Sequence, residues 1–64
     1  MDRQRLIGRV RSEFIEMPGL SLTPAEASRL WGVDPDACAQ VITALLGSAF
    51  LRWTAKGRLV RNDN

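Results

Sequence analysis

The chain has 64 residues, of which 45% are hydrophobic and 25% charged, and it carries a formal net charge of +2 at pH 7. This length leaves room for one small hydrophobic core, so we expect residues 1–64 to form a single domain with the composition of an ordinary folded protein. Cys38 is the only cysteine and histidine is absent, which excludes an intramolecular disulfide and the usual zinc sites. We therefore expect no metal and no cofactor.

Residues 2–17 have the spacing of an amphipathic helix. Arg9 lies four residues before Glu13, which predicts an ordinary ion pair on the exposed face of this helix. Pro18 and Gly19 predict its end. The apolar residues recur at steps of three and four, which places most of them on one face: Leu6, Ile7, Val10, Phe14, Ile15 and Met17.

The charged residues of this segment interrupt any long apolar run, so we expect neither a signal peptide nor a membrane span. The expected location is therefore the cytoplasm.

A second helix is predicted over residues 24–31 by its starting signal. Thr23 has the properties of an N-cap, Pro24 suits the first helical position, and Glu26 stands where it can close a capping box. We expect this helix to end at Gly32, where a left-handed backbone costs glycine little. The side chains expected to point inward are Ala27, Leu30 and Trp31.

A third helix is predicted over residues 35–47, with Asp34 as N-cap and Pro35 at the first position. Only a tight turn containing Gly32 separates it from the second helix, which predicts a helix-turn-helix. Its exposed face is nearly uncharged. The residues expected to be buried are Cys38, Val41, Ile42, Leu45 and Leu46. In that position Cys38 is a small core hydrophobe rather than a redox sensor.

A β-hairpin is predicted over residues 50–61, with a four-residue connection that ends in Gly57. Residues 20–22 alternate in polarity, which is compatible with a very short third strand. The sequence therefore predicts an α+β fold that is mainly helical: three helices followed by a two-stranded hairpin.

This order of elements, together with the stretches at residues 18–27 (PGLSLTPAEA) and 45–53 (LLGSAFLRW), resembles winged helix-turn-helix proteins. The similarity is to small stand-alone bacterial members and to the DNA-binding cores of antibiotic-resistance and arsenical-repressor regulators. It implies a transcription regulator whose third helix enters the major groove, whose hairpin, the wing, touches the backbone or minor groove, and which reads two half-sites as a dimer. Ala49 stands where the family commonly has glycine, which predicts an altered helix end or a strained Ala49. Trp53 stands where the family commonly has a basic residue, at the end of the first strand of the wing.

Under this hypothesis double-stranded DNA is the partner, and two groups of side chains would contact it. The candidates to face the bases are Ala39, Gln40 and Thr43. The candidates to contact phosphate are Arg29, Arg52, Lys56, Arg58 and Arg61. Each group also has a plainer interpretation: the first as exposed helix residues, the second as charges that protect an edge strand.

The alternative hypothesis is a protein-interaction module that keeps the winged fold and has lost DNA binding. Asp34 and Asp36 place negative charge at the start of the third helix, where phosphate would lie. Trp53 is either part of the core or, if its ring is exposed, an anchor for a partner. No paired acids, histidine or phosphate-binding glycine loop points to an enzyme.

Overall fold

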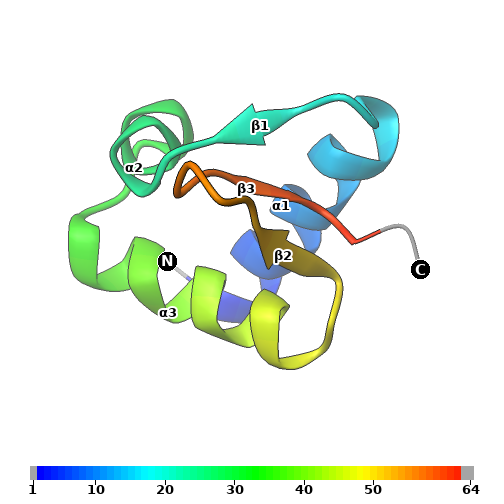
Figure 1. The fold of residues 1–64 in the computed structure, drawn as a ribbon. Helices are drawn as coiled ribbons and strands as arrows, with labels where there is room; N and C mark the ends of the chain where they lie inside the picture. Colours follow the sequence, from blue (N-terminus) through cyan, green and yellow to red (C-terminus); the bar gives the residue numbers. More distant parts are fainter. Residues whose placement is uncertain (1, 63–64) are drawn as a thin grey trace.

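The computed structural model describes residues 2–62, which form three helices and a three-stranded antiparallel sheet (Figure 1). The mainly helical α+β class is thereby confirmed. The predicted helix boundaries hold to within one residue at each end. In chain order the elements are α1 (Arg3–Glu16), β1 (Ser21–Leu22), α2 (Pro24–Trp31), α3 (Pro35–Gly47), β2 (Leu51–Trp53) and β3 (Leu59–Arg61).

The helices begin at the capping residues that the sequence indicates. Thr23 accepts a hydrogen bond from the backbone N–H of Glu26 at 3.1 Å, and the Glu26 carboxylate accepts one from the Thr23 N–H at 2.9 Å, which completes the capping box. Asp34 accepts from the N–H of Ala37 at 2.8 Å. Gly32 ends α2 with a φ of 67°, so the short turn into α3 forms as predicted.

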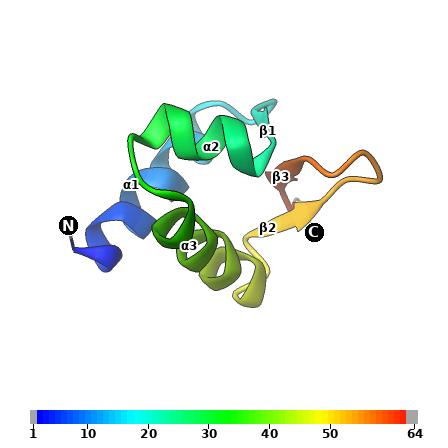
Figure 2. The same ribbon diagram turned by 90° about the vertical axis from the view of Figure 1, so that its left-hand side faces the viewer.

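The sheet has the order β1-β3-β2, so the last strand lies between the other two. The very short strand predicted within residues 20–22 is present as β1, and its Leu22 pairs with Leu59 of β3. On the other side Trp53 pairs with Leu59. Figure 2 shows the loop between β2 and β3 extending away from the three helices. Within this loop the N–H of Gly57 donates to the carbonyl of Thr54 at 3.0 Å, and Gly57 has a φ of 76°.

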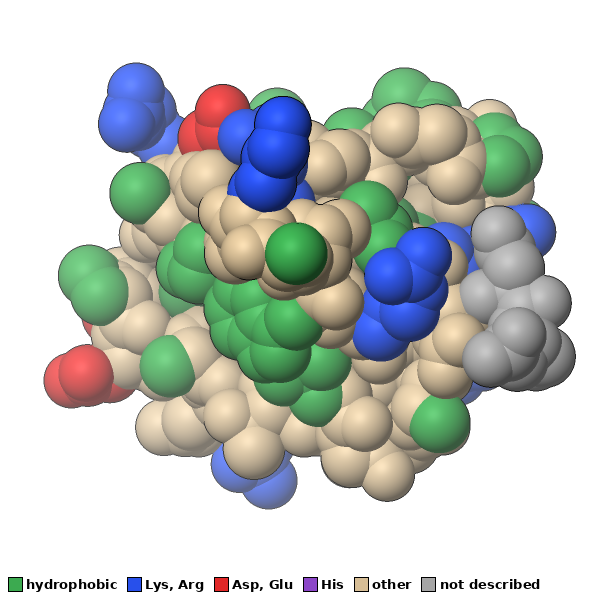
Figure 3. Space-filling model, viewed as in Figure 1, with side chains coloured by type: hydrophobic (Ala, Val, Ile, Leu, Met, Phe, Trp, Pro, Cys, Tyr) green, Lys and Arg blue, Asp and Glu red, His purple; other side chains and the backbone are tan. Residues whose placement is uncertain are grey.

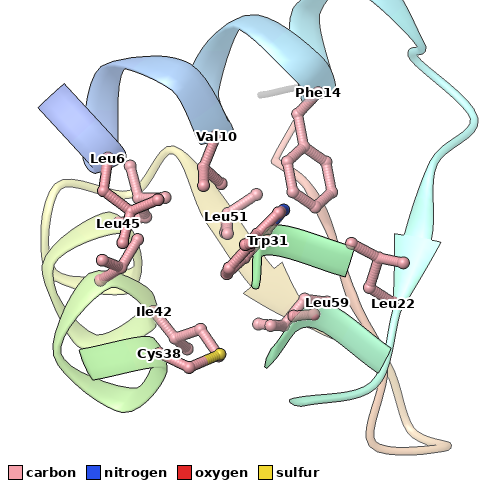
Figure 4. Packing of buried hydrophobic residues seen from close by; sticks show 12 residues of the cluster. Leu6, Val10, Phe14, Leu22, Trp31, Cys38, Ile42, Leu45, Leu51 and Leu59 are labelled. Carbon is pink, nitrogen blue, oxygen red and sulfur yellow. The ribbon is translucent and has the colours of Figure 1, made fainter. Parts of the chain in front are cut away.

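One hydrophobic core receives side chains from every helix and strand (Figure 4). α1 contributes every fourth residue along one face, as its periodicity predicts, and Cys38 is buried as expected. Trp31 lies in the middle of the cluster, between the side chains of α1 and Leu59. The buried residues are Leu6, Val10, Phe14, Leu22, Ala27, Trp31, Cys38, Val41, Ile42, Leu45, Leu51 and Leu59.

The expectation that Leu30 points inward is wrong. Its side chain is 52% exposed. Ala27 and Trp31 stand four residues apart and take the inward positions of this two-turn helix, which turns Leu30 about 100° away from Trp31. Ile15 is also exposed, at 53%, because Leu6, Val10 and Phe14 define the buried line of α1.

Ala49 adopts the left-handed backbone conformation that the departure from glycine suggested, with a φ of 62°. The N–H of Phe50 bonds to the carbonyl of Leu45 at 3.0 Å, and the N–H of Ala49 bonds to that of Leu46 at 3.1 Å. These two bonds define a Schellman motif, in which glycine is the usual residue at the position of Ala49. The motif ends α3 and sends the chain into β2, at a cost in backbone strain.

Candidate functional site

An open apolar groove of about 680 Å³ lies between α2, α3 and the end of β2. Figure 3 shows the hydrophobic side chains of this face gathered beside the hairpin, with Lys and Arg groups around them. Cys38, which forms part of the floor, has a thiol whose pKa is raised by burial. The groove is lined by Pro24, Ala25, Ser28, Pro35, Cys38, Ala39, Ile42, Thr43, Leu46 and Trp53.

Trp53 forms one wall of the groove and keeps 46% of its surface exposed. It stands two residues after Leu51, which is buried, so both side chains leave β2 on the same face of the sheet. Leu51 reaches the core, whereas Trp53, nearer the hairpin loop, lines the groove beside α3. Trp53 is therefore not part of the buried core, and its role as an anchor for a partner stays a prediction.

The three residues expected to face bases are all exposed on α3. Ala39 and Thr43 line the apolar groove on one side of the helix. Gln40 is turned toward α1, where its Oε1 accepts a hydrogen bond from Nη1 of Arg3 at 3.3 Å. A second depression, of about 460 Å³, separates α1 from α3 at this point. The exposed face of α3 between the two hollows therefore carries the uncharged side chains of Ala39, Gln40 and Thr43, whereas Asp36 adds a negative charge in the first turn.

The basic residues expected to contact phosphate do not gather at one place. Lys56 is exposed in the loop of the hairpin, and Arg52 is exposed on β2. Arg52 pairs with Val60 and Arg61 with Leu51, so Arg52 and the partly buried Arg61 leave the sheet on opposite faces. Arg29 is exposed near the end of α2, beside a shallow depression that it shares with Glu26 and Leu30.

Arg58 makes contacts that the sequence did not predict. Its Nε donates to Oγ of Ser21 at 2.8 Å, and its Nη2 donates to the backbone oxygen of Ser21 at 2.9 Å and to Oε1 of Glu26 at 3.0 Å. The pKa of the Glu26 carboxyl is lowered, first by the backbone N–H of Thr23 and also by the charge of Arg58. No signal in the sequence could have found these contacts, because they depend on the pairing of β1 with β3.

Comparison with protein-family models, with curated proteins and with solved structures found no match. Within residues 2–62, no helix is both long and apolar enough to cross a membrane.

Proposed function

We propose that this chain is a winged helix-turn-helix domain that binds double-stranded DNA, as small bacterial transcription regulators do. The observation that carries the proposal is the placement of the hairpin: its loop, which contains Lys56, extends away from the three helices (Figure 2), and Trp53 at the end of β2 lines one groove together with Ala39 and Thr43 of α3. A helix with a protruding basic hairpin at its side suits a duplex, because the helix fits the major groove while the hairpin reaches the adjacent backbone. The sheet order β1-β3-β2 also supports a winged fold.

In this proposal α3 lies in the major groove with Ala39, Gln40 and Thr43 toward the bases. Gln40 is suited to pair with both N6 and N7 of an adenine, and the methyl groups of Ala39 and Thr43 are suited to contact thymine. Gln40 would exchange its hydrogen bond with Arg3 for a base edge. As a dimer, the protein would read two half-sites separated by one helical turn.

Phosphate contacts are assigned to the exposed basic residues Lys56, Arg52 and Arg29. Lys56 has the greatest reach, since it stands in the hairpin loop. Arg61 remains a candidate from the sequence, although it is partly buried. Arg58 is left out of this group because two of its three guanidinium nitrogens already donate within the protein.

The test is the salt dependence of binding to a labelled duplex of mixed sequence. Each phosphate contact adds about 0.9 to the slope of log K against log salt, so Lys56→Ala should weaken binding and reduce the slope by about that amount. Arg5→Ala is the matched control, because Arg5 is an exposed arginine of α1 outside the proposed interface. Equal losses in the two variants would show only a general effect of net charge and would contradict a contact at Lys56.

The apolar groove favours a second candidate function, a protein-interaction module whose partner presents an apolar segment of chain. Trp53, half-exposed beside Leu46 and Ile42, offers the kind of aromatic anchor on which protein interfaces depend. This candidate predicts little affinity for DNA at any salt concentration. It also predicts that a bound partner shields Trp53 fluorescence from acrylamide, whereas the buried Trp31 is shielded in the free protein already.

A further inference from the structure

The Arg58 side chain fastens the base of the hairpin to a distant part of the chain. Its contacts with Ser21 and Glu26 span 37 and 32 residues of sequence. The backbone of the same residue closes the hairpin turn: its N–H donates to Oγ1 of Thr54 at 3.1 Å, and its carbonyl accepts from the Thr54 N–H at 2.7 Å. One residue therefore joins the hairpin loop to β1 and to the first turn of α2.

The Glu26 carboxylate links this attachment to the start of α2. Its Oε1 accepts a hydrogen bond from the backbone N–H of Thr23 as well as one from Arg58. Leu51 and Leu59 hold the strands in the core, but the strands are short, because β2 and β3 have three residues each and β1 has two. The loop beyond the strands therefore depends on contacts such as those of Arg58.

On the premise of the proposed DNA binding, we propose that Arg58 is a positioning residue that sets the direction of the hairpin, and with it the place of Lys56 relative to α3, without contacting phosphate. The charge of Arg58 is compensated by Glu26 at 3.0 Å. A phosphate that approached Arg58 would also meet this carboxylate. The contacts among Arg58, Ser21 and Glu26 therefore set the position of the hairpin and add little positive potential at its surface.

The two roles of Arg58 predict opposite effects for Glu26→Gln. If Arg58 contacts phosphate, removing the neighbouring negative charge frees the guanidinium and makes binding tighter. If Arg58 positions the hairpin, the same change loosens the attachment and makes binding weaker, although the protein becomes more positive. Glutamine at this position preserves the capping box, so α2 keeps its start.

The experiment measures the affinity of the full chain for a labelled mixed-sequence duplex by fluorescence anisotropy over a series of salt concentrations. We expect Glu26→Gln to weaken binding by about two- to fivefold, the range of an exposed ion pair, with an unchanged salt slope. Ser21→Ala removes a hydrogen-bond acceptor without changing charge and should also weaken binding. Glu16→Gln, the matched control, makes the same charge change at the exposed end of α1 and should leave binding unchanged or slightly tighter.

Two readouts separate the possible failures. Tighter binding by Glu26→Gln, or unchanged binding by Ser21→Ala, would overturn the positioning role while leaving DNA binding in place. Absence of binding by the wild type would overturn the proposed function and this role together. Solvent exchange of the Arg58 Nε–H, measured by NMR, tests the attachment without DNA: it should be slow in the wild type and clearly faster in Ser21→Ala. Equally fast exchange in both proteins would overturn the attachment itself.

Discussion

The amide oxygen of Gln40 on α3 accepts a hydrogen bond from Nη1 of Arg3 on α1 at 3.3 Å. Gln40 is the side chain of α3 best suited to read a base, and α1 engages it in the free protein. The bond is exposed and spans 37 residues. Breaking it costs little, because water replaces an exposed partner readily. Gln40 is therefore held in place yet remains available to a base edge.

From this arrangement we expect Gln40→Ala to change the sequence preference of the protein and not its affinity for mixed DNA. A bidentate pair with adenine contributes about 1–3 kcal/mol of discrimination against other bases. The measurement is selection of duplexes from a randomised pool, followed by titration of single-site variants. Gln4→Ala is a suitable control, since Gln4 is exposed on α1. An identical selected sequence for wild type and Gln40→Ala would contradict base reading by Gln40.

Ala49→Gly should stabilise the protein. Ala49 has a φ of 62°, a conformation that costs an alanine about 1–2 kcal/mol and glycine almost nothing. Glycine loses about 0.5–1 kcal/mol through the entropy of the unfolded chain, so the net gain should be about 0.5–1 kcal/mol. Thermal unfolding followed by circular dichroism should show a higher Tm. Ala55→Gly, in the hairpin loop, should give no gain, and an equal rise in both variants would contradict strain at Ala49.

The stability of the protein should fall in acid partly because of Glu26. The N–H of Thr23 and then the charge of Arg58 hold the Glu26 pKa below its ordinary value of 4.5. Below that value the unfolded chain takes up a proton more readily than the folded protein does. The contribution of Glu26 is thus complete above pH 4.5 and is lost as the pH falls through the lower pKa of the folded state.

We therefore expect Tm to fall less steeply for Glu26→Gln than for the wild type as the pH falls from above 4.5 through the lower pKa of Glu26 in the folded state. Thermal unfolding in a series of buffers measures this difference directly. Parallel curves for the two proteins would show that Glu26 has the same pKa in the folded and unfolded states.

Cys38 should react slowly with thiol reagents in the folded protein. It is 2% exposed, burial raises the pKa of its thiol, and its Sγ lies 3.7 Å from the backbone oxygen of Pro24. Thiolate is the reactive form, so both access and ionisation are restricted. The rate of reaction with a disulfide reagent should rise strongly in denaturant. A rate in buffer equal to that in denaturant would contradict the buried position.

The sequence predicted the parts of the fold that depend on local chemistry. Thr23, Asp34 and the prolines that follow them mark the starts of α2 and α3, because caps act within one helical turn. The presence of Ala49 where glycine is common correctly predicted a strained backbone at this residue, which has a φ of 62°. Leu30 was misplaced because a helix of two turns has too few residues for periodicity to distinguish its inward face.

The candidate site was less predictable, since it is assembled from segments far apart in sequence. Charge alone selected Arg58 as a phosphate contact, whereas the pairing of β1 with β3 brings it to Ser21 and Glu26. The apolar groove likewise needs α2, α3 and Trp53 together. Side-chain type indicates which residues can bind a ligand, and only the tertiary arrangement decides which of them are free to do so.

The most direct test of the central claim is a titration of the wild-type protein against labelled mixed-sequence duplex DNA at low and at near-physiological salt. The proposal predicts binding at low salt that weakens steeply as salt rises, because exposed basic residues at the hairpin and at α2 replace condensed counterions. No binding at low salt would contradict DNA recognition by this domain. That result would favour the protein-interaction candidate, with the groove beside Trp53 as its binding surface.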